Sequence, residues 1–280
     1  MPLIVRKFLK DVPATIGLAI VAFAMILFIF GEVLAPNPLD AFESHIGQRL
    51  QPPSWEYPFG TDNLGRDIFS RVILGARISL TVALMVVTAS ILIGVPLGLI
   101  AGYFGGWLSE GIMRVTDIFL AVPQLILALA LAQLLSPSLE SAMLALTLTY
   151  WPFFTRIVYA ETRRLRTALF VDALQCLGAG RMRIIFMHIL PNAASPIIVR
   201  ATIGMGFTIL TAAVLGFLGM GATPPEPDWG LAIAESRRYL PEAWWFSTFP
   251  GLAIFIAVLG FNLLGDGLRD IVDPRLRRSR

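Results

Sequence analysis

Long apolar stretches constrain this chain more than any other feature, because each is long enough to cross a lipid bilayer. Six such stretches cover residues 14–30, 80–101, 112–135, 138–158, 194–218 and 249–264. The hydrocarbon core of a bilayer is about 30 Å thick, and a helix rising about 1.5 Å per residue crosses it with roughly 20 residues. Backbone N–H and C=O groups in lipid must bond within their own segment, so each stretch is predicted to be helical. The sequence therefore predicts an all-α membrane protein with six transmembrane helices.

The composition agrees with a membrane environment and gives no sign of a catalytic or metal site. Of the 280 residues, 56% are hydrophobic and 15% are charged, whereas about a quarter are charged in a soluble domain. The formal charge is only +3 and the basic residues are scattered, which argues against nucleic-acid binding. Cys176 is the only cysteine, and His45 and His188 lie far apart, so no disulfide or metal site is predicted. No Ser/His/Asp set or catalytic carboxylate pair occurs, so no catalytic residue is predicted.

The first apolar stretch has two interpretations. Arg6, Lys7 and Lys10 precede it, as basic residues precede the apolar region of a signal peptide. However, residues 14–30 exceed the roughly 7–15 residues of such a region and approach the length of a membrane span. An uncleaved first transmembrane helix is the favoured interpretation.

The distribution of basic residues predicts the orientation, because cytoplasmic loops carry an excess of Lys and Arg. The larger set lies in both tails and between the fourth and fifth stretches: Arg6, Lys7, Lys10, Arg156, Arg163, Arg164, Arg166, Arg181, Arg183, Arg269, Arg275, Arg277, Arg278 and Arg280. The opposite loops hold Arg49, Arg66, Arg71, Arg77, Arg237 and Arg238. Both termini and the loop 159–193 are therefore predicted to be cytoplasmic, and the loops near 36–78 and 221–248 to face outward.

The loop between the fourth and fifth stretches predicts a helical hairpin. Residues 160–177 lack Gly and Pro, and Phe170, Leu174 and Leu177 recur at helical spacing, which predicts a helix with an apolar stripe. Gly178-Ala179-Gly180 is expected to end that helix. A second short helix is expected from Arg181 to about residue 190, ending at Pro191. The exposed apolar residues indicate either a protein partner or an amphipathic hairpin lying on the membrane surface.

The residues of this hairpin resemble the EAA signature of prokaryotic ABC-importer permeases. The matching positions are Asp172-Ala173-Leu174, Gly178 and Leu190-Pro191; Asp172 replaces the usual Glu, Leu174 the second Ala, and His188 the usual Ile. The resemblance implies that the hairpin docks into a cleft on a separate ATPase subunit. The residues implied in this coupling are Asp172, Ala173, Leu174, Gly178, Ala179, Gly180, His188, Leu190 and Pro191.

Further blocks narrow the resemblance to C-type permeases of the dipeptide/oligopeptide/nickel group. They include residues 58–67 (PFGTDNLGRD), 216–221 (GFLGMG) and 261–270 (FNLLGDGLRD), so the resemblance covers nearly the whole chain. It implies a type I ABC-importer (MetI-like) permease fold with six transmembrane helices, N-in and C-in. The implied division is 1–78 for the first helix and outer loop, 79–268 for the transmembrane type-1 domain with a coupling hairpin at about 160–191, and 269–280 for a cytoplasmic tail.

The resemblance also implies partners and a location. The chain would lie in the bacterial cytoplasmic (inner) membrane, among membrane lipid, and form half of a path for peptides or peptide-like molecules. It would pair with a homologous B-type permease subunit, two ABC ATPase subunits and an extracytoplasmic substrate-binding protein. ATP and Mg²⁺ would bind the ATPases and no cofactor would bind this chain. The residues agree, since the only lysines are Lys7 and Lys10 and a P-loop needs a lysine within G-x-x-x-x-G-K-[ST].

Two other classes of function remain as alternatives. A secondary carrier usually shows internal repeats or broken helices and does not need an exposed cytoplasmic hairpin. No repeat with a period of 20–50 residues occurs here. A membrane enzyme needs a reactive set of side chains that the sequence does not contain.

Polar and small residues within the apolar stretches suggest where a path or close packing lies. The candidates to line a path are Gln124, Gln133, Thr202, Thr208 and Thr211, although such residues also form hydrogen bonds between helices. Gly94, Gly98 and Gly102 form a small-residue row that favours close helix packing.

Other residues have local interpretations. In the outer loop, Asp62 is expected to cap a turn or a helix start, and Gly65 to adopt an unusual backbone conformation. Trp244, Trp245 and Phe246 are interpreted first as an interfacial aromatic belt and second as a contact for a binding protein. Glu110 and Asp117 are expected to pair with Arg114 on one helix face.

Overall fold

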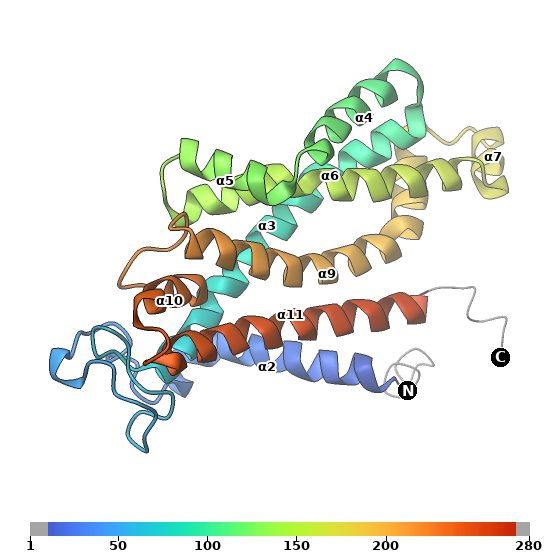
Figure 1. Cartoon of the computed structure of the whole chain (residues 1–280). Coiled ribbons are helices and arrows are strands. Elements are labelled where there is room, and N and C mark those ends of the chain that lie inside the picture. The colour runs from blue at the N-terminus through green and yellow to red at the C-terminus, as the bar shows by residue number, and fades with distance from the viewer. Residues whose placement is uncertain (1–10, 273–280) are drawn as a thin grey trace.

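A computed structural model describes residues 11–272, which form a bundle of helices (Figure 1). The longer helices are α2 Val12–Leu34, α3 Ile68–Phe104, α4 Gly106–Ala121, α5 Gln124–Leu134, α6 Leu139–Arg166, α9 Leu190–Phe217 and α11 Trp244–Val272. The shorter elements are η1 Ile46–Gln48, α7 Leu169–Cys176, α8 Arg181–Arg183, the π-helical η2 Ile184–Ile189, α10 Trp229–Ser236 and η3 Arg237–Tyr239. The basic residues Arg6, Lys7, Lys10, Arg275, Arg277, Arg278 and Arg280, which entered the orientation prediction, lie outside the described residues.

The predicted helical character of the apolar stretches is confirmed, whereas the number of crossings stays a prediction. Four helices in the described part are long and apolar enough to span a membrane: α2, α3, the run Arg181–Phe217 that ends in α9, and Trp244–Ile271 of α11. The pair α4 and α5 adds a fifth if it counts as one bent span. α6, which contains the fourth predicted stretch, is 28 residues long and carries three arginines in its last turn.

The third predicted stretch, residues 112–135, is not the single helix expected. α4 and α5 meet at an angle of 91°. Pro123 explains the break, because it lacks an N–H and its ring forces the preceding residue out of helical conformation. Val122 is accordingly extended, with φ −92° and ψ 133°. The expected pairing of Arg114 with Asp117 is also wrong, because Asp117 instead pairs with Arg156 of α6 at 3.0 Å.

The glycine row packs as predicted, with α3 lying against α6. An added Cβ at Gly94 would lie 2.5 Å from the carbonyl oxygen of Trp151, and one at Gly98 would lie 2.7 Å from that of Thr155. These approaches leave no room for a side chain. The main hydrophobic core runs along this contact and includes the buried residues Val86, Leu99, Leu146, Tyr150 and Phe154.

The hairpin between α6 and α9 differs from its prediction in two ways. The expected helix over 160–177 breaks after Arg166, and Ala168 is extended before α7 begins. Leu165 and Val171 are both buried in the same core cluster. Six residues apart, they would point in different directions on one continuous helix, so the break lets both reach the core.

The second expected helix does not end at Pro191. The chain passes from α8 through η2 into α9 without interruption, so Arg181–Phe217 forms one helical run. The N–H of Leu190 bonds to the carbonyl of Ile185, the wider spacing of a π-turn. Because Pro191 has no N–H to donate, a widened turn at this point accommodates it within the helix.

Different segments of the chain lie at the two ends of the bundle (Figure 1). The start of α2, the end of α11 and α7 lie at one end, and the loop between α2 and α3 lies with α10 at the other. This places the segments predicted to be cytoplasmic together. We call these the hairpin end and the cap end.

Candidate functional site

The tip of the hairpin, residues 169–180, presents an exposed apolar face. Leu169 is 86% exposed and Leu177 is 83% exposed, while Ala173 between them is also exposed. Val171 is buried, and Leu174 is partly buried against the main core. The outward stripe is therefore formed by Leu169, Ala173 and Leu177. The predicted stripe was wrong at Leu174, which packs inward.

Gly178 ends α7 as predicted. Its φ is +76°, a left-handed conformation that glycine adopts without steric cost. The N–H of Ala179 bonds to the carbonyl of Leu174 at 3.0 Å, and that of Gly178 bonds to Gln175 at 2.9 Å. This pair of bonds is a Schellman motif. It turns the chain sharply and holds the α7 tip in a fixed shape.

The remaining predicted coupling residues differ in exposure. Asp172, Gly180 and Pro191 are exposed, whereas Ala179, His188 and Leu190 are partly buried. They lie on α7, in the turn that follows it, on η2 and at the start of α9. The residues after the tip are anchored to the core by Ile184, Ile185 and Ile189, all buried in the same cluster as Val171. The hairpin is thus continuous with the bundle on both sides.

The predicted path-lining residues lie on two helices. Gln124 and Gln133 are on α5, where Gln133 is exposed and the Oε1 atom of Gln124 is buried without a hydrogen-bond partner among the described residues. Thr202, Thr208 and Thr211 are on α9. The hydroxyls of Thr202 and Thr211 donate to carbonyls one turn earlier on α9, and Thr208 is 1% exposed.

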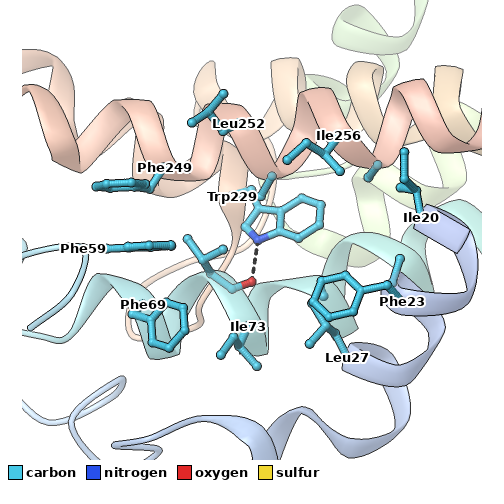
Figure 2. Close-up of a pocket in the computed structure, with 15 residues that line it drawn as sticks. Ile20, Phe23, Leu27, Phe59, Phe69, Ile73, Trp229, Phe249, Leu252 and Ile256 are labelled. Atoms are coloured by element: carbon cyan, nitrogen blue, oxygen red, sulfur yellow. Dashed lines mark hydrogen bonds between the residues drawn. The ribbon is translucent and has the colours of Figure 1, made fainter. Parts of the chain in front are cut away.

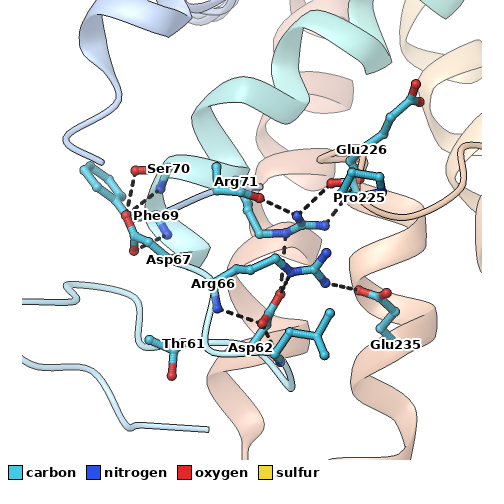
Figure 3. A network of polar contacts seen from close by, with 12 residues as sticks. Thr61, Asp62, Arg66, Asp67, Phe69, Ser70, Arg71, Pro225, Glu226 and Glu235 are labelled. Carbon is cyan, nitrogen blue, oxygen red and sulfur yellow. Dashed lines mark hydrogen bonds and ion pairs between the residues drawn. The ribbon is translucent and has the colours of Figure 1, made fainter. Parts of the chain in front are cut away.

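The cap end contains a buried polar network that joins the outer loop to α10 (Figure 3). Arg66 is 1% exposed and contacts Asp62 at 2.5 Å and Glu235 at 3.0 Å. Asp62 also accepts hydrogen bonds from the N–H groups of Leu64 and Arg66, which confirms the predicted turn, and φ is +81° at Gly65. The helix start itself is capped by Asp67.

Arg71 extends this network from the first turn of α3. Its Nη1 donates to the carbonyls of Ala41 at 2.7 Å and Pro225 at 3.1 Å, and its Nε lies 3.7 Å from Asp62. This network was not predicted from the sequence. The i, i+4 spacing of Asp62 and Arg66 was a usable signal, but nothing local indicates Glu235.

Burial raises the pKa of three carboxyls at the cap end above their ordinary values. For Asp67 and Asp228, hydrogen bonds from nearby N–H groups oppose this effect. For Glu235, the positive charges of Arg66 and Arg71 oppose it. Desolvation is the largest cause in each case.

The aromatic residues near the start of α11 do not all form an interfacial belt. Trp245 is 7% exposed and its Nε1 donates to the carbonyl of Thr61 at 3.2 Å, so it packs inside the cap. Phe246 is also buried. Trp244 is half exposed and stays available for an interface.

An apolar crevice of about 390 Å³ lies between α2, α3 and α11 (Figure 2). At its base is Trp229, whose indole N–H is satisfied by the carbonyl of Val72 at 2.9 Å. Phe59 stacks on Phe249 with ring centroids 3.9 Å apart at one end. The described residues that line it carry apolar side chains, and the indole N–H of Trp229 is already bonded, so the crevice is a poor route for charged peptides.

Comparison with known sequence families identifies two matching regions. Residues 94–278 match the family described as binding-protein-dependent transport system inner membrane component. Residues 3–53 match the N-terminal TM domain of oligopeptide transport permease C.

Similar proteins and structures agree with these matches. The chain is 44% identical over 272 residues to the dipeptide transport system permease protein DppC of Alkalihalophilus pseudofirmus, covering 97% of this chain and 89% of that protein. It is 45% identical over 278 residues to DppC of Escherichia coli, covering 97% and 92%. A chain of the MetNI methionine ABC transporter, solved in an inward-facing conformation, matches with a TM-score of 0.58 and 21% identity over 72% of this chain and 96% of that chain. At that identity the likeness concerns the fold, which is that of a MetI-like permease.

Proposed function

Because the chain belongs to the family of binding-protein-dependent transport system inner membrane components, we propose that it is the C-type permease subunit of an importer for dipeptides or similar peptides. The relatives named as dipeptide permeases match nearly the whole chain, which supports this class of substrate. The chain forms one half of the translocation path in the bacterial inner membrane. A homologous B-type permease subunit forms the other half, and an extracytoplasmic binding protein delivers the peptide to the cap end.

The hairpin tip couples this permease to ATP hydrolysis on separate subunits. The observation that carries this proposal is the stripe of Leu169, Ala173 and Leu177, which is apolar, exposed and held in shape by the Gly178 turn. Two ABC ATPase subunits bind ATP and Mg²⁺, and one of them accepts this tip in a surface cleft. Because α6 leads into the hairpin and the helical run Arg181–Phe217 leads out of it, closure of the ATPases moves both helices together.

The coupling proposal is tested by co-purification from a mild detergent with the tagged full-length chain. The test variant is Leu169→Ser with Leu177→Ser. The matched control is Val33→Ser with Leu134→Ser, since these residues are 84% and 83% exposed and lie in the last turns of α2 and α5, outside the hairpin. Wild type and control are expected to retain the ATPase subunits, and the hairpin variant to lose them while retaining the second permease. A wild-type chain that purifies alone in several mild detergents would contradict the subunit assignment and favour a secondary carrier.

Gln124 is the strongest candidate among the path residues to contact the peptide, because its buried Oε1 lacks a partner in the described part of the chain. Peptide N–H groups and an α-ammonium group are suitable donors for this oxygen. Gln124→Leu is expected to lower dipeptide uptake without changing ATPase co-purification. Thr211→Val serves as a comparison, because the Thr211 hydroxyl already bonds to its own helix. Unchanged uptake in Gln124→Leu would remove this residue from the path.

A further inference from the structure

A basic cavity lies behind the hairpin tip, on the side that faces back toward the bundle. It has a volume of about 330 Å³ and is lined by the α3 end, the α6 end and the hairpin: Tyr103, Phe104, Arg166, Gln175, Ala179, Arg181 and Ile184. A second cavity of about 240 Å³, also lined by Arg166, is bordered by Arg163, Ser109 and Tyr159. Arg166 is the residue that the two share. Among residues 11–272, no carboxylate lines the larger cavity, and Glu110 lines the smaller one.

The arginines of this region lack acidic partners, unlike their neighbours. Arg156 pairs with Asp117 and Arg164 pairs with Glu161. Within residues 11–272, no ion pair involves Arg163, Arg166 or Arg181. The Arg166 guanidinium instead lies 5.8 Å from the Tyr103 ring centre. Two guanidinium groups therefore line one cavity without a counter-charge, which favours an anion between them.

The position of the cavity indicates that this anion comes from the membrane. Its lining includes Tyr103, two residues beyond the predicted end of the second span at residue 101, and Arg166, eight residues beyond the predicted end of the fourth span at residue 158. The adjoining corner between α3 and α4 carries Trp107, which is 85% exposed. Exposed tryptophan at the end of a span is typical of the headgroup layer of a bilayer. Leu169 and Leu177, which are proposed to dock on the ATPase, lie on the exposed outer surface of the tip.

From these observations we propose that Arg166 and Arg181 bind the phosphate headgroup of an anionic phospholipid in the cytoplasmic leaflet. Basic pockets between transmembrane helices on the cytoplasmic side are known to hold such headgroups. Gln175 and Tyr103, whose side chains carry uncharged donors, also line this cavity. A lipid bound here would tie the base of the hairpin to the membrane surface. The site is independent of the peptide substrate and requires only that the chain lies in the membrane.

The test is native mass spectrometry of the full-length chain in a neutral detergent, titrated with phosphatidylglycerol and, separately, with phosphatidylcholine. The variants are Arg166→Gln and Arg181→Gln. The matched control is Arg164→Gln, which removes the same charge from the same helix end but from a residue paired with Glu161. Inorganic phosphate is added as a competitor to separate a lipid headgroup from a free phosphate.

The expected result is preferential binding of phosphatidylglycerol to wild type, weakened about fivefold by each of Arg166→Gln and Arg181→Gln and unchanged by Arg164→Gln. Equal binding of both lipids by wild type would overturn the proposal. So would an equal loss in the Arg164→Gln control, because binding would then reflect general surface charge. Displacement of the lipid by millimolar phosphate would assign the cavity to a free anion and also overturn it.

Discussion

Asp62 is the carboxylate on which the buried arginines at the cap end converge. It contacts Arg66 at 2.5 Å, lies 3.7 Å from Arg71, and is itself fully buried. A buried guanidinium left without its carboxylate is costly, because the lost attraction no longer offsets desolvation. The loop between α2 and α3 is therefore held against α10 only while all the charged residues of this network are present.

Asp62→Ala is expected to destabilise the chain by about 3–5 kcal/mol, as for other broken buried ion pairs. The control is Glu32→Gln, which removes an ion pair with Arg77 whose two side chains are 72% and 60% exposed. That change is expected to cost no more than about 1 kcal/mol. Thermal unfolding in detergent, followed by tryptophan fluorescence, measures both. Similar losses for the two variants would contradict the assignment of Asp62 as the centre of the network.

Asp228 predicts a pH dependence of stability. Burial raises the pKa of this carboxyl above its ordinary value of 3.8, although its side chain caps α10 by accepting from the Leu231 N–H at 2.7 Å. With a raised pKa, the folded chain binds more protons than the unfolded chain between the two pKa values. The free energy of unfolding contributed by Asp228 therefore falls as the pH rises through that window.

Asp228→Asn keeps a capping oxygen and removes this titration. The stability of wild type relative to Asp228→Asn is expected to increase as the pH falls from neutral toward about 4. Unfolding midpoints of the two proteins, compared across that range, measure the difference. A difference that changes in the opposite direction would show that attraction to Arg71 outweighs burial.

Single residues were predictable where their chemistry is local. Gly178 was expected to end a helix and Gly65 to adopt an unusual backbone conformation, and both have the positive φ that glycine tolerates. Asp62 was expected at a turn and forms one. The contact of Arg66 with Glu235 spans 169 positions, so no sequence spacing could indicate it.

At the scale of elements, the contact between α3 and α6 depends on glycine. Gly98→Ala is expected to destabilise the bundle by about 1–3 kcal/mol, because the new Cβ would lie 2.7 Å from the Thr155 carbonyl oxygen and 2.8 Å from the Val158 side chain. Gly111→Ala in α4 is the matched control, since nothing lies within 4 Å of its added Cβ. It is expected to stabilise by roughly 0.5–1 kcal/mol. Thermal midpoints that are lowered equally by both changes would argue against close packing at Gly98.

Helices were predicted well and their interruptions poorly. Apolar length identifies α2 and α11, because lipid requires every backbone group to bond within the helix. The break after Arg166 could not be predicted, because it follows from burying Leu165 and Val171 together. A proline in the sequence does not by itself predict where a helix ends. Pro123 lies at the 91° bend between α4 and α5, whereas the helix continues through Pro191 by way of a π-turn.

At the scale of the whole molecule, the two ends of the bundle present different surfaces. The hairpin end presents an apolar tip with a basic cavity behind it, and the cap end is closed by buried ion pairs. The fold of a MetI-like permease was predictable because ordered motifs extend along nearly the whole chain. The residues proposed for coupling were predicted from the same motifs and stay a prediction, and the orientation of Leu174, which packs inward, did not follow from them.

The most direct test of the account is dipeptide uptake into proteoliposomes that contain this chain, its second permease and its ATPases, with the binding protein outside and ATP inside. Uptake is expected to require ATP and the binding protein, to be abolished by Leu169→Ser with Leu177→Ser, and to be retained in Val33→Ser with Leu134→Ser. Uptake that continues without ATP, driven by an ion gradient and insensitive to the hairpin variant, would contradict it.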